Sequence, residues 1–158
     1  MRTSLLVAFA LLPSIALVAL ADEGTPLAPT AVAAAYLDAM ESGDLDAAEK
    51  LFGSPSSIYE SGGQEGAWKH YREHHLGPEI DAVESFTISR GESESQVSQD
   101  GSMAFVAWPM EYRIVLKGDR TIESKGTVTF VLVGGNDGFR IRHLHWSSRR
   151  KKSQAGHD

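Results

Sequence analysis

The chain has 158 residues, a formal net charge of −6 and no cysteine. This length predicts one domain that can bury a hydrophobic core. The lack of cysteine excludes disulfides, thiolate metal sites and a lipid anchor on an N-terminal cysteine. The acidic balance argues against a nucleic-acid partner, which would require a basic surface.

The first residues carry the pattern of a secretory signal peptide. Arg2 supplies a positive charge, residues 5–20 are almost wholly apolar, and an Ala-Leu-Ala cleavage site ends this run. This pattern predicts a signal peptide at 1–21 whose removal leaves a periplasmic or secreted chain beginning at Asp22. An uncleaved membrane anchor is the alternative, but Pro13 interrupts the short apolar run and no basic flank follows it. We therefore expect no integral membrane segment in the mature chain.

Residues 22–29 are predicted to form a linker, after which the pattern becomes helical. From Thr30 onward, apolar residues recur at helical spacing; they are Val32, Ala35, Tyr36, Ala39 and Met40. Asp44 is the expected N-cap of a second, short helix. A third helix is predicted over residues 64–74, and Gly77-Pro78 is expected to end it.

The C-terminal half predicts an antiparallel sheet. Residues with high β-propensity alternate in long segments separated by turn residues; the segments are 83–90, 103–117, 121–133 and 139–148. A short strand is expected at 57–60. Three helices followed by long strands indicate an α+β fold with the helices on one face of a curved sheet. Residues 149–158 are predicted to be a basic, disordered tail.

Three segments are similar to a known superfamily: "AAYLDAMESGDLDAAEKLF", "IYESGG" and "GFRIRHLHWSS". On these, residues 30–148 resemble the nuclear-transport-factor-2-like superfamily in its SnoaL-like branch. The resemblance implies a cone, in which a strongly curved antiparallel sheet wraps around three N-terminal helices and leaves an open pocket at the wide end. Members include isomerases, dehydratases, ligand binders and assembly domains, so the fold does not fix the chemistry. The outer sheet face often pairs two protomers, which implies a homodimer.

The last strand carries the first group of candidate site residues. Phe139 and Ile141 are its natural core-facing pair. With a period of two, His143 and His145 share their face and are predicted to point into the pocket. Two histidines about 7 Å apart on one strand face can ligate a metal ion or act as an acid–base pair.

A second group lies on and beside the third predicted helix. His70 and His74 are four residues apart on one helical face, a spacing that suits zinc or copper. His75 points about 100° away from His74 around the helix. Glu60 and Glu79 flank this helix and can add a carboxylate.

These groups lead to two hypotheses for the site. In the first, zinc or copper is held by His143 and His145 together with His74 or His75. In the second, His145 or His143 acts as a general base with Glu60 as its partner. Alternatively, the strand histidines are hydrogen-bonded interior side chains and the helix histidines form a solvated face.

Further pocket walls are expected from five aromatic residues: Tyr59, Trp68, Tyr71, Trp108 and Tyr112. Trp68 and Tyr71 can equally be packing residues. Trp108 and Tyr112 can equally lie on a dimer surface, because Pro109 predicts a bulge or sheet edge in their strand and so leaves its inward face open. The opposite face of the last strand, with Arg140, Arg142 and Trp146, is expected to lie on the outer surface.

We therefore predict an exported binding protein for a small organic ligand or a metal ion, with a histidine-lined pocket. One alternative is an enzyme, a lyase, isomerase or hydrolase that uses a pocket histidine as general acid or base. The other is a dimerisation or assembly domain. The sequence contains no phosphate loop, dinucleotide fingerprint or nucleophile elbow.

Overall fold

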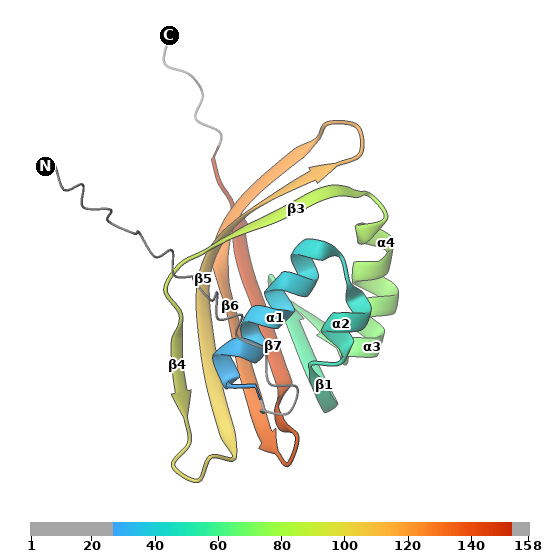
Figure 1. Cartoon of the computed structure of the whole chain (residues 1–158). Coiled ribbons are helices and arrows are strands. Elements are labelled where there is room, and N and C mark those ends of the chain that lie inside the picture. Colours follow the sequence, from blue (N-terminus) through green and yellow to red (C-terminus); the bar gives the residue numbers. More distant parts are fainter. Residues whose placement is uncertain (1–26, 153–158) are drawn as a thin grey trace, which may run out of the picture.

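The computed structural model describes residues 27–152. They form a sheet that bends around a layer of helices, with α1 against its concave face (Figure 1). The predicted signal peptide at 1–21 and most of the predicted linker lie outside the described residues, as do residues 153–158. Within residues 27–152, no helix is long and apolar enough to cross a membrane.

Helices dominate the first half of the described chain and strands the second. The first half contains α1 (Pro29–Ser42), α2 (Leu45–Glu49), β1 (Phe52–Glu60), β2 (Gly63–Gly66), α3 (Trp68–Tyr71), the π-helical η1 (Arg72–Leu76) and α4 (Gly77–Ile80). The second half contains β3 (Val83–Arg90), β4 (Glu94–Val97), β5 (Met103–Leu116), β6 (Thr121–Gly135) and β7 (Gly138–Arg150). This order confirms the predicted α+β class.

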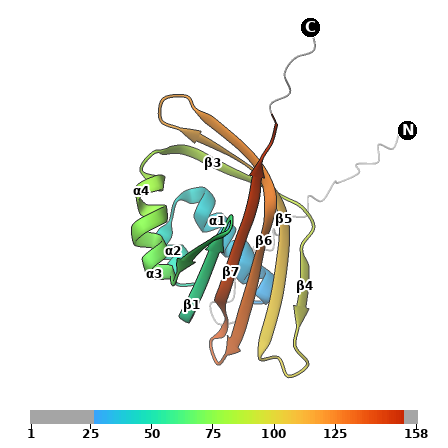
Figure 2. The same ribbon diagram turned by 180° about the vertical axis from the view of Figure 1, so that it is seen from behind.

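All strands belong to one sheet in the order β2-β1-β7-β6-β5-β3, with β4 pairing to the other end of β5. Every pair is antiparallel except β1 with β7, which is parallel. Figure 2, seen from the sheet side, shows how β5, β6 and β7 bend together around the helices. The predicted cone is therefore confirmed, with one parallel pair in place of a fully antiparallel sheet.

Helix α1 supplies the centre of the core. Val32, Tyr36 and Leu37 are fully buried on the side that faces the sheet. The ring of Tyr36 meets the ring of Phe130 on β6 edge-on, with 5.6 Å between centroids. Because burying one large apolar side chain stabilises a fold by about 1.5–3 kcal/mol, packing on the sheet holds α1 in place more than helix propensity does.

Local signals set the ends of the first two helices. Helix α1 begins at Pro29, one residue before the expected Thr30, because proline suits the first turn of a helix. Gly43 is its C-terminal cap, with a φ of 69° in the left-handed region that glycine adopts readily. The carboxylate of Asp44 accepts a hydrogen bond from the Ala47 amide at 2.8 Å, which confirms the predicted cap of α2.

The third helix is displaced from its predicted position. Gln64 lies in β2, which pairs with the end of β1, so the helix starts at Trp68. Gly77-Pro78 does not end it. Pro78 lies in the first turn of α4, where the backbone amide needs no hydrogen-bond partner within the helix, so the amide proton that proline lacks is not missed. The helical segment therefore continues through η1 to Ile80, well beyond the expected His74.

A bulge interrupts β7. Val131 of β6 pairs with His143, while the next residue, Leu132, pairs with Ile141. Arg142 is therefore an extra residue between two pairs, which is the definition of a bulge. Because strand side chains alternate between faces, one extra residue moves every later side chain to the opposite face.

The bulge overturns the predicted orientation of the histidines. Ile141, Leu144 and Trp146 are all buried on the inner face. His143 and His145 consequently lie on the outer face, where His145 is exposed. The expectations that these histidines point into the pocket and that Trp146 lies outside were wrong. They assumed strict alternation of side chains along the whole strand, and the bulge breaks that alternation.

Pro109 marks a break in the pairing of β5, as its missing amide proton predicts. Strand β3 pairs with β5 as far as Met110, and β4 pairs with it from Ala107. Between them, the Gly91 amide donates to the Pro109 carbonyl at 2.9 Å. The β5–β6 register passes through this point without a shift.

The end of β7 extends further than predicted. Arg149 and Arg150 pair with β6. The Lys151 amide donates to the Glu123 carbonyl at 2.9 Å, and its ammonium forms an ion pair with Glu111. The predicted disorder of the basic tail is therefore wrong for residues 149–151.

We expect Phe130→Ala to lower the free energy of unfolding by about 3–5 kcal/mol, because it removes a fully buried ring and leaves a cavity beneath α1. Thr129→Ala, the neighbouring residue on the outer face, should cost less than about 1 kcal/mol. Urea denaturation of both variants measures the difference. Equal losses would contradict the assignment of the two faces.

Candidate functional site

The helices and the concave sheet face enclose a cavity of about 100 Å³, which we call the inner cavity. Its lining residues are Tyr36, Met40, Glu60, Tyr71, Leu76, Glu79, Ile80, Val83, Phe86, Tyr112, Ile114 and Trp146. Most of this wall is aromatic or aliphatic. The carboxylates of Glu60 and Glu79 are its acidic groups, and the lining contains no lysine or arginine.

Glu60 reaches the inner cavity through the alternation of β1. It is the last residue of that strand, two positions after the fully buried Ile58, and so shares its inner face. In the parallel pair with β7, Glu60 stands opposite Trp146. Ser61 and Gly62 follow with positive φ and turn the chain away. Glu60 therefore forms part of the wall of the inner cavity, and its catalytic role stays a prediction.

Tyr71 donates a hydrogen bond from its phenol to Glu60 Oε2 at 2.5 Å. The Tyr71 side chain is almost fully buried. Burial raises the pKa of Tyr71 well above its ordinary value, and the nearby Tyr36 and Glu60 raise it further. The phenol therefore keeps its proton and acts as a donor to the carboxylate.

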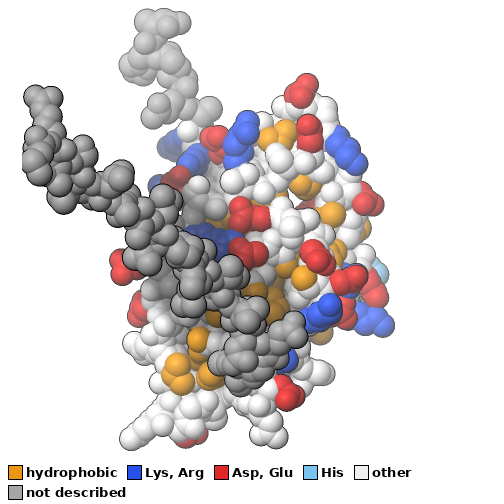
Figure 3. Space-filling model, in the orientation of Figure 1, with side chains coloured by type: hydrophobic (Ala, Val, Ile, Leu, Met, Phe, Trp, Pro, Cys, Tyr) orange, Lys and Arg blue, Asp and Glu red, His pale blue; other side chains and the backbone are white. Residues whose placement is uncertain are grey.

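His75 stands among three carboxylates beside the inner cavity. Its Nε2 lies 3.5 Å from Glu60 Oε2 and 3.5 Å from Glu79 Oε2, and its Nδ1 lies 3.4 Å from Glu65 Oε2. Acidic side chains are numerous on this helix-bearing side of the molecule (Figure 3). The group formed by Glu60, Glu65, Glu79 and His75, which we call the acidic rim, carries a negative net charge whether or not the imidazole is protonated.

The predicted aromatic residues take different positions. Tyr71 and Tyr112 line the inner cavity, and the Tyr112 hydroxyl hydrogen-bonds to Ser148 Oγ at 2.7 Å. Trp68 is buried in the core, stacked on Phe52 at 4.5 Å between centroids. Trp108 lies outside the lining, and its indole donates to the Gly91 carbonyl at 2.8 Å.

Tyr59 lies on the outer face with the strand histidines. Its ring centroid is 5.3 Å from that of His143 and 6.5 Å from that of His145. Ser57 Oγ is hydrogen-bonded to His143 Nδ1 at 2.8 Å. Desolvation lowers the pKa of His143, and the adjacent His145 lowers it further. This outer-face group is separated from the inner cavity by the sheet.

The structure does not bring the four predicted metal ligands together. His143 and His145 are on the outer face, and His75 is in the acidic rim. His74 lies beside His70 on the exposed side of the helix, with 4.5 Å between ring centroids and the ring planes tilted by 43°. Among residues 27–152, no group of three or more His, Asp or Glu side chains is arranged to hold a metal ion.

The sequence analysis did not place Trp146 and Phe86 in the inner cavity. Trp146 was assigned to the wrong face because of the bulge. Phe86 was hidden because sequence alone did not show which face of β3 turns inward. Glu79, expected as a carboxylate beside the predicted helix, lies on α4 and lines the inner cavity. The sequence did contain one signal for the inner face of β7: Leu144 and Trp146 are large apolar residues two positions apart, and both are buried.

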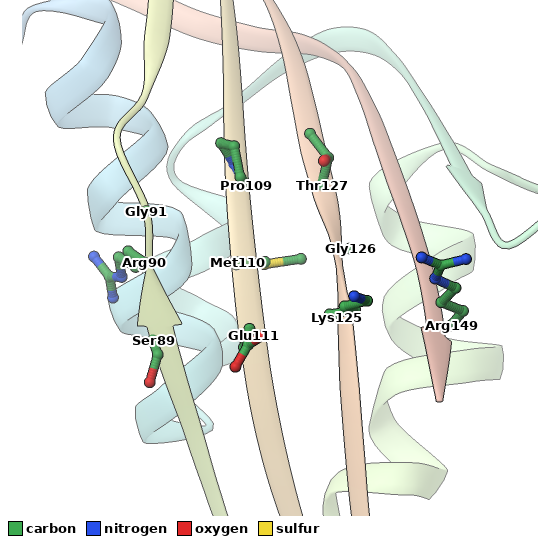
Figure 4. A pocket seen from close by; sticks show the side chains of 10 residues that line it. All are labelled: Ser89, Arg90, Gly91, Pro109, Met110, Glu111, Lys125, Gly126, Thr127 and Arg149. Atoms are coloured by element: carbon green, nitrogen blue, oxygen red, sulfur yellow. The ribbon is translucent and has the colours of Figure 1, made fainter. Parts of the chain in front are cut away.

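A larger groove of about 490 Å³ lies on the sheet itself, along β3, β5, β6 and β7. Figure 4 shows its residues spread along these neighbouring strands, with charged side chains from Glu111, Lys125 and Arg149. Charged groups of both signs are mixed there and the groove is open to solvent. The inner cavity is therefore the better candidate site, because it combines burial with a few convergent polar groups.

Comparison with known proteins shows the family. The chain matches the SnoaL-like domain over residues 30–150 and belongs to that family. The predicted resemblance is thereby confirmed. No curated protein matches the chain significantly.

Solved structures agree with this fold. A nuclear-transport-factor-2-like superfamily protein from Salmonella enterica serovar Typhimurium is 21% identical, with a TM-score of 0.67 and coverage of 80% of this chain and 92% of that one. A ketosteroid isomerase-like protein from Erwinia carotovora atroseptica is 16% identical, with a TM-score of 0.62 and coverage of 78% and 93%. A protein with a cystatin-like fold from Caulobacter vibrioides is 14% identical, with a TM-score of 0.64 and coverage of 80% and 89%. At these identities the likeness concerns the fold.

Replacing Tyr71 with phenylalanine should lower the free energy of unfolding by about 1.5–3 kcal/mol, because it removes a hydrogen bond to a charged carboxylate. Tyr112→Phe is the matched control, since its hydroxyl bonds to the neutral Ser148 and should cost about 0.5–1.5 kcal/mol. Chemical denaturation measures both. A Tyr112→Phe loss as large as that of Tyr71→Phe would contradict the charged character of the Glu60 contact.

Stability should fall as the pH rises above about 10, the ordinary tyrosine pKa in the unfolded chain. Burial raises the folded-state pKa of both Tyr71 and Tyr36, so the unfolded chain loses these protons first and high pH favours unfolding. Each such tyrosine contributes a slope of about 1.4 kcal/mol per pH unit. Denaturation between pH 9 and 11 should show a shallower slope for Tyr71→Phe. An unchanged slope would mean that Tyr71 ionises freely in the folded protein.

Proposed function

We propose that this chain is an exported binding protein whose inner cavity holds a small organic molecule. The single observation that carries the proposal is the composition of the cavity, in which an apolar and aromatic wall surrounds the hydrogen-bonded pair Tyr71 and Glu60. Small-molecule sites have this character, with many apolar contacts for affinity and a few polar groups for orientation.

The size of the inner cavity limits the ligand. An apolar protein cavity of about 150 Å³ accommodates benzene, and the inner cavity has about 100 Å³. The inner cavity is therefore smaller than a benzene site, so a small aliphatic group fits inside it and a one-ring ligand fits with part of the ligand outside, beside the acidic rim. A larger ligand would have to move the helical segment that carries Leu76, Glu79 and Ile80.

A second candidate function is acid–base catalysis. It is favoured by the position of Glu60, whose Oε2 contacts both the Tyr71 phenol and the His75 imidazole. A carboxylate in contact with two proton-carrying groups is suited to moving a proton at a bound substrate. In this version Glu60 keeps its predicted catalytic role, while His75 replaces His143 and His145 as the imidazole.

Export and pairing of two copies are also parts of the proposal. Export rests on the sequence of residues 1–21. Pairing rests on the outer face, where Met103, Val133 and Tyr59 are large apolar or aromatic side chains with 47%, 40% and 38% exposure. Met103 and Val133 are paired neighbours on β5 and β6, and adjacent exposed apolar side chains are typical of a protein–protein contact.

The test is a titration of the isotope-labelled protein with benzyl alcohol, followed by nuclear magnetic resonance of the Trp146 indole. A probe of about eight non-hydrogen atoms at about 0.5 kcal/mol per atom binds with a dissociation constant of about 1 mM. We expect Ile114→Phe, which fills the inner cavity, to weaken this binding at least about tenfold.

The control is the double variant His143→Ala/His145→Ala, which alters only the outer face and should bind the probe like the unaltered chain. Loss of binding in this double variant, with normal binding in Ile114→Phe, would place the site on the outer face and overturn the proposal.

A further inference from the structure

We propose that the inner cavity selects an organic cation: a protonated amine carried on one small apolar or aromatic group. This inference rests on the proposed function and specifies the chemical class of its ligand. It combines the charge of the acidic rim, the hydrogen bonds still open there and the arrangement of the aromatic wall.

The charge of the site favours a cation. Glu60 and Glu79 both line the inner cavity, Glu65 joins them through His75, and the lining has no lysine or arginine. Three carboxylates beside one imidazole leave at least two negative charges without a matching positive group in the acidic rim. A bound ammonium would reduce this repulsion, whereas a carboxylate or phosphate ligand would increase it.

The rim also offers hydrogen-bond acceptors at one place. Oxygens of Glu60 and Glu79 each lie 3.5 Å from the same nitrogen, His75 Nε2. These two oxygens, from β1 and α4, therefore lie close together around His75 Nε2, and both carboxylates keep further acceptor capacity because each has about four lone-pair sites. An ammonium group carries N–H donors and no acceptor, and its hydrogen bonds to carboxylates are stronger than those between neutral groups. It matches a site whose free groups are acceptors.

The aromatic wall suits the other side of such a ligand. Phe86, Tyr112 and Trp146 form a triangle of rings, with centroid separations of 5.7 Å, 6.4 Å and 5.7 Å and with the ring planes inclined to one another. All three line the inner cavity. The faces of aromatic rings attract cations and pack against apolar groups, and Trp gives the largest effect. The carboxylates and the ring triangle thus complement the two ends of one amphipathic cation.

Burial separates this site from an ordinary solvated acidic surface. The side chains of Glu60, Glu65 and His75 are only 24%, 25% and 29% exposed. At such positions charge pairs are screened less by water and salt than on an open surface. The charge of the rim should therefore discriminate between ligands of the same shape.

The experiment compares three probes of similar shape at pH 7 by the same resonance titration: benzylamine, which is cationic, benzyl alcohol, which is neutral, and benzoate, which is anionic. We expect benzylamine to bind at least about tenfold more tightly than benzyl alcohol, and benzoate to bind more weakly than both. Glu60→Gln should reduce the preference for benzylamine to about threefold or less. It keeps an oxygen that accepts the Tyr71 hydrogen bond, so the fold is retained.

Two further variants sharpen the comparison. Glu79→Gln removes the more exposed carboxylate of the rim, and should lower the same preference by a smaller factor without any effect on folding. Glu73→Gln is the matched control, because it removes an exposed carboxylate from η1 that does not line the inner cavity, and it should keep the full preference.

The outcomes separate the two proposals. Binding of benzyl alcohol or benzoate as tight as that of benzylamine, or the same preference in Glu60→Gln and the unaltered chain, would overturn the selection of a cation and leave the proposed binding function standing. Failure of all three probes to bind would overturn both.

Discussion

The unpaired residue Arg142 in β7 decides what the inner cavity contains. A strand presents alternate side chains to its two faces, so the extra residue exchanges the faces for the remainder of the strand. Leu144 and Trp146 are thereby buried, and two imidazoles are placed outside. The opposite arrangement would bury His143 and His145 and expose an indole, at a cost of about 1–3 kcal/mol for each polar group left without a partner. Once buried, Trp146 forms the part of the cavity wall next to Glu60, its pairing partner on β1.

Glu60 shows how the fold tolerates a carboxylate beside an apolar cavity. A charged group removed from water needs hydrogen bonds to replace those it loses. Tyr71 supplies one from a buried phenol, and His75 stands beside the same oxygen. The residues come from β1 and from the continuous helical segment of α3 and η1, so the charge is held in place by a contact between a strand and a helix. The acidic rim is consequently a part of the tertiary structure, and its charge is directed at the cavity.

The sheet separates two surfaces with different chemistry. The inner face holds the core, the aromatic triangle and the acidic rim. The outer face holds the histidines of β7, Tyr59 and exposed apolar residues on β5 and β6. An ion pair of Arg90 with Asp38 and Glu41 connects β3 to α1, at 2.5 Å and 2.7 Å. This contact keeps the helix on the concave face, and so helps to keep the two surfaces apart.

Much of the fold followed from local patterns in the sequence. The periodicity of residues 30–40, the cap at Asp44 and the long alternating segments after residue 83 identified the elements and the α+β class, because these signals arise from residues close together in the chain. The same patterns made Glu60, Tyr71 and Tyr112 candidates for the pocket, but they left the face of the strand that carries Tyr112 open, because Pro109 predicts a bulge or sheet edge. The bulge at Arg142 left only an indirect signal, the apolar pair Leu144 and Trp146, because the position of the bulge depends on how β6 and β7 pair after the sheet bends. The continuation of the helix through Gly77-Pro78 likewise depends on packing against the sheet. The sequence by itself therefore determined the elements and their order, while the tertiary structure decided which charges and rings meet in the inner cavity, because that depends on strand register and on contacts between distant segments.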